Sequence, residues 1–518
     1  MLTHHRYWQS LQSTRFVAFW QRQSRLRLLC ILLGLATAYD IVLAVLAPPP
    51  DSGTAGFVTL WLIGFLPYLL ACMVVLTRQA PDGRQRWLEL GVIMGGALLL
   101  RSILLPIPPD LSHDSWRYLW DARVTLNGFS PYVYAPGNPV LGHLWDFLYA
   151  NSRFRNVPSI YPPGAQAFYI LSYLIAPENL FVLKGLFILC ELLSCGLLAY
   201  LLYKKGSDPA RCIIYAWCPL PIVEFAIQGH LDVLTIMFTL LTLVCAQGNW
   251  RGARVCTGFC LALATLTKLY PILMVVAVLR RKDWALLVTC AATIVLAYVP
   301  YLILGHGQVL GFFSSYADEF TPNAGLTQHL VHWLSAQIPM THQLIQWLTY
   351  ALDLLIIGEG LLFIFILRWK SNLSMEAATL ILFGLIFSVS SHIFPWYTTA
   401  LLPFVALLIK PFRPRNQEKQ PQARARMIAL LTTWYFCVMS ITGYYYGRDW
   451  SLYYVLAYDL TLVGLGWAIA VAANSKKVSA AGSTENLASK QRDKEVNSSS
   501  ADNGELSSAA FETQRLRG

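Results

Sequence analysis

Apolar stretches of about 20 residues recur along most of this chain, and short polar connectors separate them. A helix of that length crosses about 30 Å of hydrocarbon. Open sheets and loops cannot face lipid, because their backbone hydrogen-bonding groups would stay unpaired, so each stretch predicts a membrane-spanning helix. The expected spans lie near 27–47, 57–77, 87–107, 180–203, 210–228, 231–247, 284–304, 343–368, 373–391, 397–410, 427–443 and 452–472.

One further apolar segment, "VCTGFCLALATLTKLYPILMVVAVLRRKDW", does not fit a single span, because basic residues flank both of its ends. Proline breaks a helix, and Pro271 stands near the middle of this segment, shortly after Lys268. We therefore expect two short half-helices that meet around residues 268–271. The whole pattern predicts an all-α polytopic membrane protein of roughly 12 to 14 transmembrane helices.

Composition agrees with this class of protein. The 518 residues are 56% hydrophobic and 13% charged, which is far too apolar for a soluble protein of several domains. The formal net charge is +11, but Lys and Arg occur in short clusters between the spans, which indicates membrane topology and not nucleic acid binding. All eleven cysteines lie within or at the ends of apolar segments, so we expect free thiols.

The basic clusters also predict which side of the membrane each connector faces. Placing them inside makes residues 1–26 a basic cytoplasmic N-terminus, with the first span as its own targeting signal. The transmembrane domain is then 27–473, and its long loop 108–164 lies outside. The tail 474–518 is rich in Ser, Ala and charge, so we expect it to be cytoplasmic and disordered.

The outer loop contains the most unusual stretch, "PDLSHDSWRYLWDARVTLNGFSPYVYAP". Asp114, Arg117, Tyr118 and Asp121 follow the spacing i, i+3, i+4, i+7, which predicts one face of a helix, and Ser112 is placed to cap it. A purely structural interpretation is an interfacial helix with an Asp–Arg pair and an aromatic belt.

Further polar residues fall on the same outer side of the predicted topology. Each has a structural alternative: a helix cap for the "QGHLD" pair, a snorkelling side chain for the lysine of "TKLYP", an aromatic belt for "FPWY" and a rigid turn for "IYPPG". Ionisable groups at the bilayer are costly, so their convergence on one side favours a functional site. The residues concerned are Tyr161, His230, Asp232, Lys268, His392, Trp396, Tyr397 and Arg448.

Five phrases in this order resemble the membrane glycosyltransferases of the GT-C superfamily, and most of all the bacterial polyprenyl-phosphate-mannose-dependent mannosyltransferases. They are "HDSWRYLWDARVTLNGFSPYVYAP", "SIYPPGAQAFY", "QGHLDVLTIMFTLLTL", "TLTKLYPILM" and "HIFPWYTTALLPF", and they cover about residues 87–410. Three spans precede the outer loop here, where the commonest family pattern has one.

The resemblance implies a GT-C-like helical bundle whose outer loop carries interfacial helices and an acidic catalytic base, at the position of Asp114. It implies a hexose donor on a polyprenyl phosphate, with mannose as the sugar, and no metal or other cofactor. The acceptor would be a hydroxyl of a lipid or glycan. The implied location is the bacterial inner membrane, with the site facing outside.

The chemistry of such a transfer assigns roles to the candidate residues. The acceptor hydroxyl needs a carboxylate, which Asp114 supplies with Asp121 as runner-up. Direct displacement at the anomeric carbon inverts its configuration, and no glycine-rich cradle for a nucleotide sugar is visible. The departing phosphate needs cations, for which the candidates are Arg117, Lys268, His392 and Arg448. The candidates for binding the sugar and the acceptor are Trp116, Tyr118, Asp121, Tyr161, His230, Asp232, Trp396 and Tyr397.

Two other classes of protein remain open on the sequence alone. A flippase or transporter of lipid-linked saccharides also places charges in the bilayer, although it should show internal repeats and a polar path to the inner face. A non-catalytic assembly subunit would need no aspartate base, so replacing Asp114 separates it from an enzyme.

Overall fold

The computed structural model describes residues 23–46, 54–312, 315–316, 321, 323–370, 373–412, 421–445 and 451–474. Most of the predicted cytoplasmic N-terminus, the predicted disordered tail and Arg448 lie outside these residues. The chain divides into two compact units, and the site described below lies within the larger, which comprises Met1–Phe412 and Thr433–Asp459.

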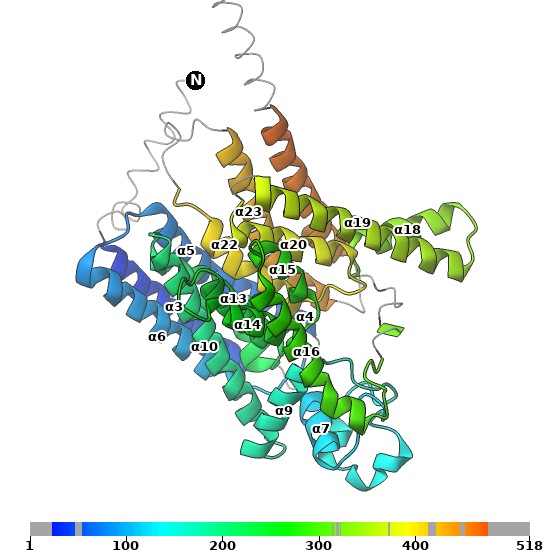
Figure 1. Ribbon diagram of the computed structural model, residues 1–518. Helices are drawn as coiled ribbons and strands as arrows, with labels where there is room; N and C mark the ends of the chain where they lie inside the picture. The colour runs from blue at the N-terminus through cyan, green and yellow to red at the C-terminus, as the bar shows by residue number, and fades with distance from the viewer. Residues whose placement is uncertain are drawn as a thin grey trace, which may run out of the picture. The chain divides into compact units, whose positions relative to one another are not determined.

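The described residues form helices, turns and loops and contain no strand, which confirms the predicted all-α polytopic membrane protein (Figure 1). Eight helices among them are long and apolar enough to cross a membrane. A ninth candidate is the pair Pro209–Ala216 and Pro219–Ile227, which bends by 54°. The eight are Arg25–Leu46, Gly56–Thr77, Gly83–Leu104, Leu180–Lys204, Trp284–Leu304, His342–Lys370, Pro421–Tyr444 and Ser451–Asn474.

Shorter elements connect or interrupt the spans. In the first half of the chain the helices are α3 (Arg25–Leu46), α4 (Thr54–Ile63), α5 (Phe65–Thr77), α6 (Gly83–Leu104), α7 (Asp114–Leu126), η1 (Pro139–Leu144), α8 (Phe147–Asn151), α9 (Pro163–Ile175), α10 (Leu180–Lys204), η2 (Pro209–Cys212), α11 (Ile213–Ala216), α12 (Pro219–Ile222), the π-helical turn η3 (Val223–Ile227) and α13 (Asp232–Ala246). The second half contains α14 (Ala253–Thr267), η4 (Tyr270–Leu273), α15 (Met274–Val278), α16 (Trp284–Leu304), α18 (Leu326–Gln337), α19 (His342–Lys370), α20 (Met375–Val389), α21 (Pro395–Thr398), η5 (Thr399–Leu401), α22 (Leu402–Leu408), α23 (Pro421–Met439), η6 (Ser440–Tyr445), α24 (Ser451–Tyr453) and η7 (Tyr454–Asp459).

The predicted break in the segment after residue 253 is present. Helix α14 ends at Thr267, Lys268 is extended, and Pro271 stands within the short η4. Helices α13 and α14 have 15 residues each, or about 22 Å, which is less than the hydrocarbon thickness. Because they pack antiparallel, the start of α13 and the end of α14 lie together, where the Thr235 and Thr267 hydroxyls are 2.9 Å apart.

Helix α7 begins at Asp114, so the helix predicted within residues 108–164 is confirmed. It is not exposed at an interface, because almost every residue from Ser115 to Val124 is buried. Helix α9 and the loop helix α8 pack against α7. Figure 1 shows α7 and α9 near the ends of α10 and α16. The loop therefore forms a small folded layer that fixes the direction of the α7 N-terminus.

A buried ion pair inside the helical bundle was not expected from the sequence. Arg101 of α6 contacts Glu191 of α10, and both side chains are fully buried. The same guanidinium donates to the carbonyl oxygens of Ala97 at 2.9 Å and Ala216 at 2.7 Å. A buried charge needs such partners, so this cluster ties two spans to the bent helix pair.

Candidate functional site

Backbone contacts hold Asp114 in place at the first turn of α7. The Ser112 hydroxyl accepts from the Asp114 backbone N–H at 3.3 Å, but the N-cap residue of α7 is His113, so the predicted helix cap at Ser112 is wrong. Just before it, Gln228 accepts from the backbone N–H groups of Leu111 and Ser112, at 3.1 and 3.2 Å. The approach to α7 is thus anchored to the segment that follows the bent helix pair.

The Asp114 carboxylate points into a group of buried polar side chains. The Tyr161 hydroxyl lies 3.5 Å from its Oδ2, and Nδ1 of His230 lies 3.9 Å from the same atom. The Asp114 side chain keeps 17% of its surface exposed, whereas His230 is fully buried. Asp114 is therefore the more accessible of these two side chains.

Lys268 supplies a cation beside this carboxylate. Its Nζ donates to Oδ1 of Asp232 at 2.7 Å and lies 3.6 Å from the ring centroid of Tyr397. The antiparallel packing of α13 and α14 explains the pair, because Asp232 begins α13 and Lys268 follows α14. The Lys268 side chain is only 14% exposed, so it is paired and buried, in contrast to the snorkelling alternative.

Aromatic rings from "SSHIFPWY" form a wall around the same group. Trp396 stacks on the His230 ring with centroids 3.9 Å apart and an interplanar angle of 12°. The Tyr397 hydroxyl lies 3.0 Å from that of Tyr316, whose ring stacks on His392 at 4.3 Å. Two residues of this motif therefore contact the charged group directly, and His392 reaches it through a tyrosine.

Three tyrosines complete the wall: Tyr118 of α7, Tyr161 just before α9 and Tyr169 of α9. The Tyr118 ring stacks on Tyr169 at 4.4 Å and meets Tyr161 edge-on at 5.1 Å. The predicted rigid turn at Tyr161 is also present, because α9 begins at Pro163 and the Tyr132 hydroxyl donates to the Tyr161 carbonyl at 2.6 Å. Tyr161 thus stands just before the start of α9, and its hydroxyl faces Asp114.

Arg117 and Asp121 do not join this group, although the sequence placed them among the phosphate and substrate ligands. Arg117 pairs with Asp121 at 2.8 Å and donates to the carbonyl oxygens of Phe154 and Val157, at 2.9 and 3.1 Å. Gln166 donates to the other Asp121 oxygen at 3.3 Å. Both groups are buried and satisfied within the loop, which supports the structural interpretation of this pair.

Of the two remaining sequence candidates, only Trp116 lies among the described residues, and it stands apart from the site. Trp116 packs edge-on against Phe147 of α8, with centroids 5.4 Å apart, and so belongs to the loop layer. Arg448 lies outside the residues that the structure describes.

Two side chains behind His230 were not predicted from the sequence. The Glu224 Oε2 lies 3.4 Å from the His230 Nε2, and Tyr444 donates to the Glu224 carboxylate with both oxygens at 3.0 Å. A glutamate within the predicted apolar span 210–228 was the available signal. No local sequence motif predicts that Tyr444, which lies on a distant helix, contacts Glu224.

Lys184 was also missed, and it holds the turn that carries His230. Its Nζ donates to the carbonyl oxygens of Ile107 at 2.6 Å and Ile227 at 3.4 Å. Its stem packs on Gly229, which has φ +70°, and a Cβ there would lie 3.1 Å from Lys184 Cγ and 3.2 Å from Ser115 Cβ. The turn therefore requires glycine for both its conformation and its close packing.

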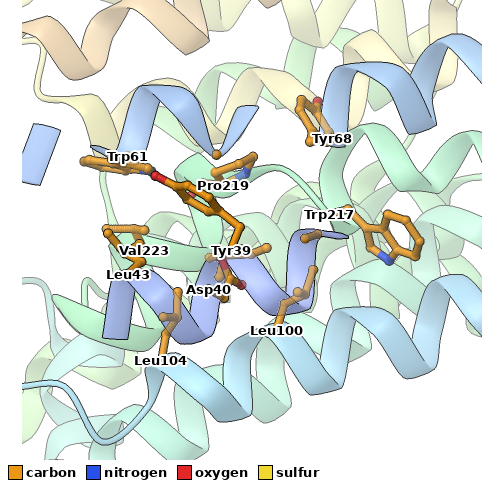
Figure 2. A pocket seen from close by; sticks show the side chains of 13 residues that line it. Tyr39, Asp40, Leu43, Trp61, Tyr68, Leu100, Leu104, Trp217, Pro219 and Val223 are labelled. Atoms are coloured by element: carbon orange, nitrogen blue, oxygen red, sulfur yellow. The ribbon is translucent and has the colours of Figure 1, made fainter. Parts of the chain in front are cut away.

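A separate hollow lies between α3, α4, α5, α6 and the segment 217–223 (Figure 2). Its lining is mostly apolar and aromatic, and Figure 2 shows Tyr39 and Asp40 of α3 within it. Asp114 and Lys268 do not line it. The charged group around Asp114, and not this hollow, is therefore the candidate active site.

Metal-ligand geometry is not found in the described part of the chain. No group of three or more His, Cys, Asp or Glu side chains there could hold a metal ion. The expectation of metal-independent chemistry remains a prediction that the donor assay below examines.

Comparison with known proteins supports an enzyme of one class. The model of Glycosyltransferase family 87 matches residues 160–391, which include Tyr161, His230, Asp232 and Lys268. No curated protein and no solved structure matches the chain. The family match and the apolar helices together indicate a multi-pass membrane glycosyltransferase.

The charges around Asp114 predict how activity depends on pH. Burial raises the pKa of Asp114, and the Lys268 ammonium opposes that rise. If Asp114 is the base that the sequence predicts, it must be unprotonated, so we expect activity to be lost as pH falls through this raised pKa. Lys268→Met removes the opposing cation, so the acid limb of kcat/KM should move to higher pH. An acid limb that stays in place or moves to lower pH would contradict this arrangement of charges. The control is Arg251→Met, which also removes a cation but at an exposed position.

Proposed function

We propose that this protein transfers a hexose, with mannose as the first candidate, from a polyprenyl phosphate to a hydroxyl of a lipid or glycan on the outer face of the bacterial inner membrane. The observation that carries the proposal is the placement of the Asp114 carboxylate near the Lys268–Asp232 ion pair, in a buried group lined by tyrosine and tryptophan. The family match supplies the class of reaction.

In this proposal Asp114 accepts the proton of the acceptor hydroxyl as that oxygen attacks the anomeric carbon. The bond from the anomeric carbon to the phosphate oxygen breaks in the same step, so the configuration inverts. The geometry supports this role, because Asp114 sits at the N-terminal end of α7 with part of its side chain exposed. Base catalysis of this kind needs hydrogen-bond reach to the proton that is removed.

Lys268 stabilises the negative charge that develops on the departing phosphate. An ammonium has three donors, and Asp232 accepts from one of them at 2.7 Å. Asp232 thereby fixes the direction of the lysine, and Tyr397 lies beneath it. A preorganised cation in a buried site acts more strongly than one in water. The wall of Tyr161, Trp396 and Tyr397 offers a surface for the sugar.

A flippase or transporter of lipid-linked saccharides is the second candidate. It would require polar groups on a continuous path across the membrane. The charged side chains of the candidate site gather around the α7 N-terminus and the turns beside it, whereas the buried Arg101–Glu191 pair in the bundle is a separate ion pair whose guanidinium is bonded to backbone carbonyls. Together with the glycosyltransferase family match, this concentration favours chemistry over transport.

The donor is tested with purified full-length protein in lipid vesicles. We expect transfer of hexose from a polyprenyl-phosphate hexose after treatment with a chelator. Inversion should appear as opposite anomeric configurations in donor and product. Activity with a nucleotide sugar alone, or activity that chelation abolishes and a divalent metal restores, would refute the proposed donor chemistry.

The outer location is tested by labelling with an impermeant thiol reagent. Two exposed positions are suited to it: Val140 in the loop element η1 and Arg251 in the turn between α13 and α14. In a variant without the native cysteines, Val140→Cys should react in intact cells and Arg251→Cys only after lysis. The reverse pattern would place the Asp114 site on the cytoplasmic side.

A further inference from the structure

The segment that leads to His230 has an unusual backbone. Residues Val223–Ile227 form a π-helical turn, so the Gln228 N–H bonds to the Val223 carbonyl at 3.1 Å. The backbone N–H of His230 then bonds to the carbonyl of Glu224 at 3.0 Å. Single π-turns occur frequently at functional sites, because they redirect side chains that a regular helix would separate. Here the turn brings the side chains of Glu224 and His230 face to face.

Glu224 is held firmly on its far side. Both carboxylate oxygens lie 3.0 Å from the Tyr444 hydroxyl, and both side chains are buried. The Tyr444 ring is packed between Trp61 and Trp396, at 5.9 and 6.2 Å. Burying a carboxylate costs free energy, so we infer that Glu224 has a role beyond filling space in the core.

His230 lies between two carboxyl groups. Its Nε2 is 3.4 Å from Oε2 of Glu224 and its Nδ1 is 3.9 Å from Oδ2 of Asp114. Stacking on Trp396 fixes the plane of the ring, so its two nitrogens keep these directions. The distance to Asp114 exceeds a hydrogen bond, and contacts of this kind commonly tighten only in the substrate complex.

We propose that Glu224 and His230 form a proton relay behind Asp114, held in register by Tyr444 and Trp396. The inference rests on the proposed function and deepens it by saying where the acceptor proton goes. Asp114 remains the residue that meets the acceptor, whereas His230 and Glu224 act through it and are positioning residues.

The relay conserves protons and charge on the imidazole. The acceptor hydroxyl loses its proton to Asp114 as the new glycosidic bond forms. Asp114 passes that proton to Nδ1 of His230, and the proton on Nε2 passes to the Glu224 carboxylate. Asp114 is then again a carboxylate, and the ring is neutral before and after. The departing phosphate therefore leaves beside an aspartate that carries no proton.

Several other groups face this relay and bear on its pH dependence. Tyr161 contacts Asp114 from the loop, and Tyr444 contacts Glu224 from η6. The nearest cation is Lys268, which follows α14 and pairs with Asp232 of α13. Arg153 also acts on Asp114 electrostatically. The Lys268 charge disfavours a second positive charge on the ring, which is consistent with a relay through neutral imidazole.

The relay is tested by chemical rescue of the full-length protein in vesicles, with a polyprenyl-phosphate hexose as donor. His230→Ala opens space beside Trp396 and should lower kcat by about 10²-fold while KM for the donor stays the same. Added imidazole should restore part of kcat. The double variant His230→Ala with Glu224→Gln should gain nothing from imidazole, because no carboxylate remains to receive the second proton.

Further variants keep the test informative if His230→Ala folds poorly. Glu224→Gln keeps the volume and an oxygen for Tyr444, and it should lower kcat without a change in KM. Tyr68→Phe is a control for the loss of buried hydrogen bonds elsewhere in the protein, since the Tyr68 hydroxyl donates to the Ile214 carbonyl at 2.7 Å and accepts from the Trp434 indole at 2.9 Å, away from the relay. It should leave kcat unchanged.

The outcomes separate the relay from the function on which it rests. Wild-type kcat in both His230→Ala and Glu224→Gln, or equal rescue of the single and double variants by imidazole, would overturn the relay while the wild type still transfers sugar. A wild type that transfers no sugar from the lipid phosphate would overturn the proposed function and the relay together.

Discussion

Replacing Asp114 by asparagine is expected to lower turnover by about 10² to 10⁴-fold, the usual contribution of general base catalysis. The amide keeps the size of the side chain and can still meet Tyr161, which lies 3.5 Å from the carboxylate, but it cannot accept the acceptor proton. Folding and donor binding should persist, because no ion pair at hydrogen-bond distance is lost. Turnover and donor KM of the purified variant measure this.

Asp121→Asn is the matched control on the same helix. Its carboxylate pairs with Arg117 at 2.8 Å and accepts from Gln166 at 3.3 Å, so its loss should lower thermal stability and leave turnover of the wild-type order. If Asp121→Asn abolished transfer while Asp114→Asn retained it, the roles of the two aspartates would be reversed.

Lys268→Met is expected to lower turnover by about 10² to 10³-fold. This is the usual effect of losing one preorganised group that stabilises charge in the transition state. Methionine keeps the length of the stem and its packing on Tyr397 but removes the ammonium. Lys268→Arg keeps the charge and should retain more activity than Lys268→Met. The measurement is single-turnover transfer at saturating donor, which isolates the chemical step from binding.

A buried partner complicates that variant, and a second change resolves the matter. Asp232 pairs with Lys268 at 2.7 Å and would be left as an unpaired buried charge. The double variant Lys268→Met with Asp232→Asn removes both charges, so it should recover stability and stay inactive. Recovery of activity in the double variant would show that Lys268 only neutralises Asp232.

Much of the fold follows from the sequence, because the bilayer limits which structures can cross it. The recurrence of apolar stretches predicted the eight long spans, whereas the expected spans 231–247, 373–391 and 397–410 form shorter apolar helices. Pro271 with two basic flanks predicted the break at Lys268. The spacing from Asp114 to Asp121 predicted α7. In each case the signal is local, since it lies in residues that are neighbours along the chain.

The candidate site was only partly predictable, because its contacts join distant segments. The loop aspartate and the later "QGHLD", "TKLYP" and "FPWY" phrases were recognised, and the structure brings Asp114, His230, Lys268 and Trp396 together. Helical periodicity places Arg117 on the same face as Asp114, but it does not predict where the long side chain points. In the structure the guanidinium donates to carbonyl oxygens of the loop.

Glu224 and Tyr444 show the other limit of sequence reasoning. Glu224 looks like an isolated charge in an apolar run, and only the π-helical turn points it at His230. Tyr444 lies 220 residues from Glu224 along the chain. Pairing over such a distance depends on how the helices pack, which no local pattern records.

The account is tested most directly in the host cell, by mass spectrometry of extracted glycolipids and surface glycans. A strain without this gene should accumulate a glycolipid or glycan that lacks one hexose. The wild-type gene should restore the complete species, and the Asp114→Asn gene, expressed to the same level, should not. An unchanged profile in the deletion strain, or full restoration by Asp114→Asn, would contradict a glycosyltransferase that acts through Asp114.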